Sequence, residues 1–252
     1  MRFSRLLSRW QGVVLSLLGI VATLWLAASG QLGLYIHPRY YGFTVIMAVL
    51  AAVLCLAAFA FVPGSTDEDD EHEGHATPAP RGRRWAMLGG AAIIVGSAIA
   101  LLALPPAALS SATVEQRELN SGSAAVDAPD LVGADTAAFT VRDWASLLAQ
   151  NPSPDDVAGT PVDVVGFVTA DPAGSADVFY IARFVVTCCA VDAQPVGVPV
   201  HFPGWQEQFQ TDDWVEASGA FIRNPDATGA TPLTLLPETI EPVEQPAEPY
   251  VY

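Results

Sequence analysis

The first part of the chain is dominated by three long apolar stretches, whereas the second part is built from short apolar segments separated by polar turns. The stretches are Gly12–Ser29, Tyr41–Val62 and Trp85–Leu104, and none contains Asp, Glu, Lys or Arg. About 20 apolar residues in a helix cross a bilayer. The pattern therefore predicts a membrane domain over residues 1–106 with three transmembrane helices. For the first stretch, a cleaved signal peptide is the alternative, because Leu26–Gly30 resembles a small-residue cleavage site.

Arginine clusters predict how these helices are oriented. One cluster precedes the first stretch and another directly precedes the third: Arg2, Arg5 and Arg9, then Arg81, Arg83 and Arg84. Positive clusters next to membrane helices stay in the cytoplasm. We therefore expect a cytoplasmic N-terminus, a cytoplasmic loop over 63–84 and an extracytoplasmic C-terminal half, with Arg39 as the single dissenting charge.

The loop over 63–84 is acidic, contains proline and has no apolar period, which is typical of a solvated linker. His72 and His75 lie among its carboxylates. Imidazole and carboxylate groups together can hold a divalent cation. We keep both interpretations, a solvated spacer and a weak cytoplasmic metal site.

Beyond the third stretch, residues 107–138 are rich in Ser, Ala and Gly, which predicts a flexible tether. Structure is expected to resume at Thr140, a plausible helix N-cap with Asp143 three residues later. The following apolar residues fall on one helical face, and Asn151 and Pro152 end the pattern. One leading helix is therefore expected before the strands.

Five segments rich in β-branched and aromatic residues then predict five strands: Val162–Thr169, Val178–Cys188, Val196–Phe202, Asp213–Ile222 and Pro232–Val243. Gly166 and Gly219 lie inside strands, which indicates bulges or sharp coiling. We expect residues 139–245 to form a mainly-β, OB-like five-stranded barrel, with a generic β-sandwich as the alternative. Residues 246–252 are expected to be a C-terminal tail.

The net charge of the chain limits the kinds of molecule that it can bind. The chain has 27 Asp and Glu against 11 Lys and Arg, and its formal net charge is −16. Only four basic residues follow the apolar stretches: Arg117, Arg142, Arg183 and Arg223. So acidic a C-terminal half repels phosphate backbones, which argues against nucleic-acid binding. Because the sequence also lacks a defensible catalytic triad, phosphate loop or carboxylate pair, we do not expect an enzyme.

Two of the three cysteines, Cys188 and Cys189, are adjacent. On a regular strand their side chains would alternate, so the two sulfurs would point to opposite faces. They can act together only if the second strand ends near Thr187. The turn-forming residues that follow make this possible. Cys55 lies in the middle of the second apolar stretch, where packing is its simplest role.

Four interpretations of the pair stay open. Both cysteines can be buried small hydrophobes, or they can form a vicinal disulfide in an oxidising compartment. They can bind a soft or transition metal or metalloid, with Asp192 and His201 as further ligands, or they can exchange disulfides. Arg183 would either pair with a carboxylate or favour the thiolate of Cys189 on its own face.

The run GFV…DVFYIARFVVTCCAVDAQPVGVPV…DWVEASGAF, with YIHPRY after the first stretch and a closing EPYVY, resembles a bacterial family of uncharacterised membrane proteins. Its members are described as the accessory subunit of a two-component permease complex. The most specific part is a CCxxDAxPxG pattern, matched by Cys188, Cys189, Asp192, Ala193, Pro195 and Gly197.

The resemblance implies a bacterial plasma-membrane protein that lies in the lipid bilayer beside a multi-span permease partner. We expect an accessory subunit whose extracytoplasmic β domain binds or gates a small solute or metal-containing ion. The alternative is a membrane-anchored thiol- or metal-handling protein, either a metallochaperone or a redox protein.

Overall fold

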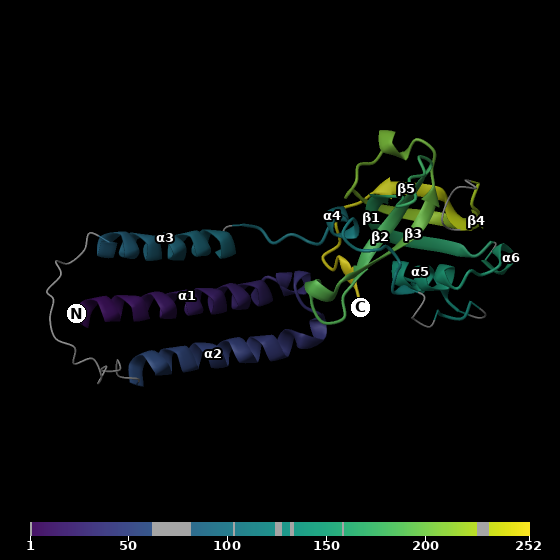
Figure 1. Ribbon diagram of the computed structural model, residues 1–252. Helices are drawn as coiled ribbons and strands as arrows, with labels where there is room; N and C mark the ends of the chain where they lie inside the picture. The colour runs from purple at the N-terminus through teal and green to yellow at the C-terminus, as the bar shows by residue number, and fades with distance from the viewer. Residues whose placement is uncertain are drawn as a thin grey trace. The chain divides into compact units, whose positions relative to one another are not determined.

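A computed structural model describes residues 2–61, 82–102, 104–123, 128–131, 134–157, 159–225 and 232–252. The chain divides into two compact units (Figure 1). The first comprises Met1–Leu32 and Pro38–Pro106, and the second comprises Gly33–His37 and Ala107–Tyr252. His72 and His75 lie outside the described residues, so the weak cytoplasmic metal site stays a prediction.

The first unit is helical. Its elements are α1 (Arg2–Ala28), η2 (Pro38–Tyr40), α2 (Tyr41–Phe61) and α3 (Gly82–Leu102), while η1 (Gln31–Leu34) lies at the boundary between the units. The first helix contacts both α2 and α3. Ala22 and Ala48 are among the few buried side chains, since small residues let helix backbones approach.

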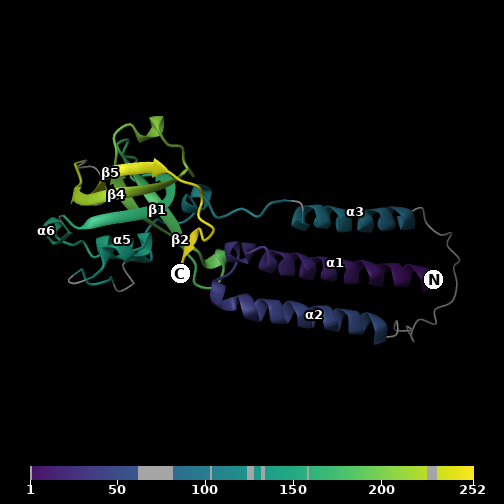
Figure 2. The ribbon, with the colours of Figure 1, turned by 180° about the vertical axis from the view of Figure 1, so that it is seen from behind.

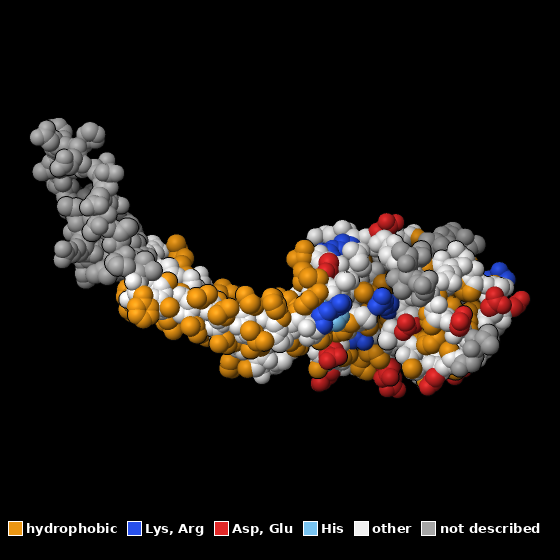
Figure 3. All heavy atoms as spheres, turned by 90° about the horizontal axis from the view of Figure 1, so that it is seen from below, with side chains coloured by type: hydrophobic (Ala, Val, Ile, Leu, Met, Phe, Trp, Pro, Cys, Tyr) orange, Lys and Arg blue, Asp and Glu red, His pale blue; other side chains and the backbone are white. Residues whose placement is uncertain are grey.

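Most of the large apolar side chains of these helices are exposed, and Figure 3 shows hydrophobic side chains covering the described part of the helical unit. Two helical segments are long and apolar enough to cross a membrane, Trp10–Ala28 and Pro38–Phe61. The apolar part described in α3, Leu88–Leu102, is shorter than a full crossing needs. Two of the three expected spans are thus candidate membrane helices, and the third stays a prediction.

The second unit contains a six-stranded mixed sheet, seen from two sides in Figures 1 and 2. Its strands are β1 (Pro161–Ala170), β2 (Val178–Val185), β3 (Gln194–His201), β4 (Trp214–Arg223), β5 (Leu233–Pro242) and β6 (Tyr250–Val251). Their order is β1-β4-β5-β3-β2-β6, with an additional pairing between β1 and β2. The strand count differs from the expected five because β6, inside the predicted tail, pairs in parallel with β2.

Two glycines allow the strands to bend. β1 pairs with β4 along its first part and with β2 along its last, and a Cβ added at Gly166 would lie 2.5 Å from the carbonyl oxygen of Ala182. A side chain there would block the approach of β2. The pairing of β4 with β5 shifts register between Ser218 and Gly219, where an added Cβ would collide with β5. The bulge expected at Gly219 is confirmed.

The leading helix is α5 (Val141–Ala149), and its capping box is the predicted one. The Thr140 amide donates to the Asp143 carboxylate at 2.8 Å, and the Asp143 amide donates back to the Thr140 hydroxyl. Trp144 of this helix is fully buried against Phe139 and Phe221, so α5 belongs to the main core. Two short helices, α6 (Pro154–Val157) and η6 (Trp205–Glu207), add Val157 and Trp205 to that core.

The described part of the predicted tether is folded onto the domain. It holds α4 (Ser111–Val114) and η4 (Thr136–Ala138). The Asn120 side chain exchanges two hydrogen bonds with the backbone of Gly197, at 2.8 and 2.9 Å. An asparagine amide can imitate a neighbouring strand because it both donates and accepts. The polar composition of this segment predicted a flexible tether and did not indicate these hydrogen bonds.

Candidate thiol and metal site

The cysteine pair lies in the segment Val186–Ala193, here called the thiol loop, which connects β2 with β3. β2 ends at Val185, earlier than the predicted Cys188. Phe184 and Val186 are buried, but Cys188 is exposed and Cys189 is half-buried. The strand thus ends before Thr187, which meets the condition under which the sequence allows the two sulfurs to act together.

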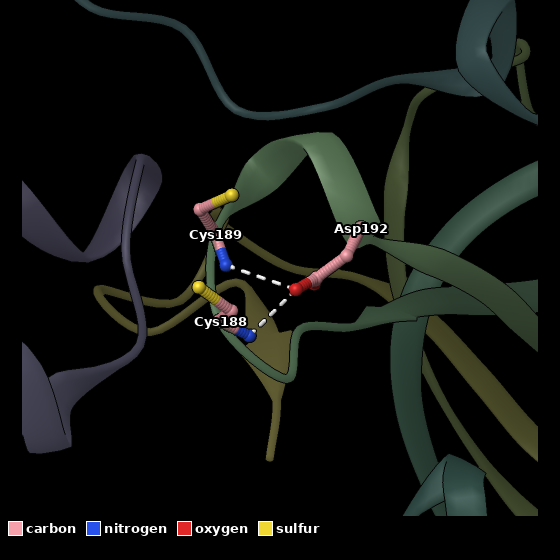
Figure 4. A group of neighbouring side chains, drawn as sticks. All are labelled: Cys188, Cys189 and Asp192. Carbon is pink, nitrogen blue, oxygen red and sulfur yellow. Dashed lines mark hydrogen bonds between the residues drawn. The ribbon is translucent and has the colours of Figure 1, made fainter.

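The carboxylate of Asp192 explains the early end of the strand. It accepts the backbone N–H of Thr187 at 3.0 Å, of Cys188 at 2.8 Å and of Cys189 at 3.3 Å. Figure 4 shows the two cysteine nitrogens turned toward this carboxylate. Three consecutive amides of a regular strand point to alternating sides and cannot all reach one carboxylate. The backbone therefore leaves the strand conformation here, and the two sulfurs are no longer forced onto opposite faces.

The short segment Gly33–His37 holds further backbone groups of the thiol loop. Ile36 forms a β-bridge with Cys189. The His37 amide donates to the Cys188 carbonyl at 3.0 Å, and the Ala190 amide donates to the Tyr35 carbonyl at 2.8 Å. This segment includes part of the YIHPRY sequence noted above, whose role the sequence did not reveal.

A third support comes from Arg117. Its guanidinium donates to the carbonyl oxygens of Val191, at 2.9 Å, and Ala193. These carbonyls flank Asp192 on both sides. Sequence analysis singled out Arg117 only as one of four late arginines, because the partner carbonyls are more than 70 positions away along the chain.

The loop thus holds three possible ligand atoms together. The two sulfurs and a carboxylate oxygen of Asp192 lie within 4.8 Å of one another. Thiolates bind soft and transition metals at about 2.3 Å, so a small contraction would let both sulfurs reach one ion. Because the carboxylate already accepts three N–H groups, it organises the loop and has little capacity left as a ligand.

His201 is not part of this group. β2 and β3 are antiparallel, with Val185 opposite Gln194 at one end and Val178 opposite His201 at the other. His201 follows Gln194 by seven positions along the strand, or about 23 Å at the usual rise. The predicted fourth ligand is therefore at the opposite end of the strand pair from the cysteines.

Arg183 is occupied elsewhere. Its guanidinium donates to the carbonyl oxygens of Pro249, at 3.1 Å, and Glu248, and it lies 5.6 Å from the centre of the Trp214 ring. Burial lowers the pKa of Arg183, against the smaller opposing effects of Tyr252 and Glu248. In the structure, this arginine holds the C-terminal segment against β2.

Comparison with known families matches both halves of the chain. Residues 11–120 match the DUF1980 N-terminal domain, and residues 132–252 match the DUF1980 C-terminal domain. The chain belongs to the DUF1980 family. No curated protein matches it. The C-terminal match contains the thiol loop, and the N-terminal match contains both Gly33–His37 and Arg117, so the supports of the loop come from both DUF1980 domains.

Proposed function

We propose that this DUF1980 protein is a non-enzymatic accessory subunit of a membrane permease, and that its C-terminal domain captures a metal-containing ion at the thiol loop. The observation that carries the proposal is the clustering of Cys188, Cys189 and the Asp192 carboxylate within 4.8 Å on a loop whose backbone is held by three partners. A loop already held in place loses little entropy when it binds an ion.

The donor set favours a thiophilic ion. Two adjacent thiolates are soft ligands, and a hard cation such as Mg²⁺ or Ca²⁺ prefers six or more oxygens. Cys188 is exposed, so an ion can reach the sulfurs from solvent. The strongly acidic surface of the C-terminal unit, visible as red side chains in Figure 3, would attract cations toward it.

The membrane assignment rests on the helices and the arginines. Two apolar helices are long enough to cross a bilayer, and clusters of arginine precede the apolar parts of α1 and α3. We infer three spans in the bacterial plasma membrane, a cytoplasmic N-terminus and an extracytoplasmic C-terminal unit. Three spans without Asp, Glu, Lys or Arg offer no evident ion path, which favours an accessory role beside a multi-span permease.

The architecture proposed for the capture domain is an OB-like barrel. β1 pairs with β4, β4 with β5, β5 with β3, β3 with β2, and β2 again with β1. This succession of pairings closes on itself, which is the arrangement expected when five strands form a barrel. β6 is an addition beside β2.

Metal capture can be tested on the reduced full chain in detergent. Silver(I) is added under anaerobic conditions, and bound metal and thiol alkylation are measured by mass spectrometry. We expect one equivalent bound and Cys188 and Cys189 protected together. Cys188→Ser and Cys189→Ser should lose this ion, whereas the matched control Cys55→Ser should keep it. Equal metal binding in all four proteins would refute capture at the loop.

The accessory role needs a separate experiment. Tagged protein solubilised from native membranes should co-purify with a multi-span membrane protein. Recovery as a monomer without a partner would contradict the accessory role and leave metal capture standing. That result would favour the second candidate, an independent thiol- or metal-handling protein, which the exposure of Cys188 supports.

A further inference from the structure

A second, smaller site lies behind the thiol loop. A cavity of about 160 Å³ is lined by Ser123, by Arg142 and Ser146 of α5, and by Thr187 and Gln194 at the two ends of the loop. Gly122 and valine side chains of β2 and β3 complete its described lining, and neither cysteine contributes. We propose that this cavity, here called the Ser123 cavity, binds a small oxyanion.

The first argument is a buried hydroxyl without a partner. Ser123 is 3% exposed, and its Oγ makes no hydrogen bond in the described part of the chain. A buried polar group without a partner costs free energy, and native proteins rarely keep one. Because the same side chain lines the Ser123 cavity, a bound group there can supply the missing partner.

The second argument is charge. No Asp or Glu is among the described residues that line the cavity, although the chain as a whole has 27 acidic residues. Arg142 contributes a positive charge, and no ion pair joins it to any described residue. Its neighbour Asp143 is committed to the capping box, where it accepts from the Thr140 amide and hydroxyl at 2.8 and 2.7 Å. An uncompensated guanidinium favours an anion over a cation.

The third argument is the arrangement of donors and the size. Arg142 and Ser146 are one helical turn apart, so both face the same side of α5. Ser146 donates to the Arg142 carbonyl at 2.6 Å, and the Gln194 amide reaches the Asp192 carbonyl only at 3.5 Å. The Gln194 amide and the Ser123 hydroxyl therefore keep donor capacity for a ligand. A single water, whose share of liquid volume is about 30 Å³, would leave most of the space unfilled.

These features together describe a site for an oxyanion of a few heavy atoms, bound by one guanidinium and by hydroxyl and amide donors. The inference goes beyond metal capture, since it uses neither sulfur. Thr187 lies near the start of the thiol loop and Gln194 directly follows it, so an anion in the Ser123 cavity would contact both ends of the segment that carries the cysteines.

The test uses the full chain in detergent, in chloride buffer free of oxyanions, titrated with inorganic phosphate and, separately, sulfate. Binding is followed by calorimetry and by the thermal unfolding temperature. We expect saturable binding of at least one of them below about 10 mM. Arg142→Gln and Ser123→Ala should each weaken that binding about tenfold or more. Arg223→Gln, which removes an exposed arginine at the end of β4, should leave it unchanged.

Ser123→Ala separates binding from folding. The hydroxyl has no partner to lose, so without oxyanion this variant should unfold at the same temperature as the parent or slightly higher. Unchanged affinity in both variants, or no saturable binding of either anion, would show that the Ser123 cavity holds water alone. Equal losses in Arg142→Gln and Arg223→Gln would reduce the effect to general charge and also overturn the proposal.

Discussion

One carboxylate, that of Asp192, determines how the cysteine pair is presented. It lies at the end of η5 (Ala190–Asp192), three residues after Cys189, and this spacing lets it reach back to three backbone amides. Hydrogen bonds from amides to a carboxylate are stronger than those between neutral groups. The Asp192 side chain therefore fixes the path of the backbone, and this path determines where the two sulfurs lie.

Replacing this carboxylate tests its role. Asp192→Asn keeps the shape but turns one acceptor oxygen into a donor that faces backbone N–H groups. We expect a loss of about 1–3 kcal/mol of stability and faster amide hydrogen exchange at residues 187–189. Hydrogen exchange measured by mass spectrometry on the full chain checks this.

Asp135→Asn is the control for Asp192→Asn, because the Asp135 carboxylate accepts a single amide, that of Ala137, at 3.3 Å. It should leave exchange in the thiol loop unchanged. If Asp192→Asn also leaves residues 187–189 protected, the carboxylate does not set the backbone path and the loop is held by its other contacts.

The grouping of Cys188, Cys189 and Asp192 could be predicted from the sequence because all three lie within five consecutive positions. His201 could not be placed in the same way. Its proximity depended on where β3 begins and on the direction in which it runs, and the antiparallel register carries it away from the loop. The contacts of Arg183 were hidden for a related reason, since its hydrogen-bond partners are carbonyls at residues 248 and 249.

Among the elements, β6 shows how a very short strand is positioned by side chains. Tyr250 and Val251 pair with Phe184 and Val185 of β2, and Arg183 holds the two carbonyls just before them. The Tyr250 hydroxyl accepts the Leu109 amide at 3.0 Å and donates to the Leu34 carbonyl at 3.3 Å. One phenol thus joins three separate segments of the second unit.

Alkaline pH should release this contact. Burial raises the pKa of Tyr250 above its ordinary value of 10.0, with a smaller opposing effect of the Leu109 amide. A raised pKa in the folded state means that the stabilisation is complete below pH 10 and is lost as pH rises through the folded value. Tyr250→Phe should lose about 1 kcal/mol at neutral pH and fall less steeply than the parent above pH 10.

Denaturant unfolding at several pH values measures both effects of Tyr250→Phe. Parallel curves for the parent and the variant across the alkaline range would contradict a folded-state shift at Tyr250.

The longer elements were predictable because local rules and tertiary packing agree. The capping box of α5 and the β-branched runs of β1, β4 and β5 place those elements within two residues of their predicted limits. β6 has two residues and no local signal, and Asn120 replaces strand pairing with a side chain. Such contacts arise only from the folded arrangement.

At the scale of the whole molecule, the thiol loop depends on residues from both DUF1980 domains. Gly33–His37 belongs to the same compact unit as the β domain, although in sequence it lies between α1 and α2. The main-chain contacts of this segment satisfy groups of the thiol loop that Asp192 does not reach. Weakening the contacts of this segment should therefore make the cysteines more accessible.

His37 allows this to be tested in the full chain with a matched pair of variants. His37→Pro removes the N–H that donates to the Cys188 carbonyl, whereas His37→Ala keeps it and removes only the ring, which packs 4.6 Å from that of Tyr252. We expect Cys189, half-buried in the parent, to alkylate several-fold faster in His37→Pro than in His37→Ala. Equal rates in the two variants would mean that the bridge does not restrain the loop.

The bridge between Ile36 and Cys189 also fixes the parity of membrane crossings. Two strands that share hydrogen bonds must be on one side of a bilayer, so the chain between them has to cross an even number of times. α2 and α3 are the long apolar helices described in that interval. If α2 crosses, α3 has to return the chain, however short its apolar part, and a topology with a single intervening crossing would leave the two bridge partners on opposite sides.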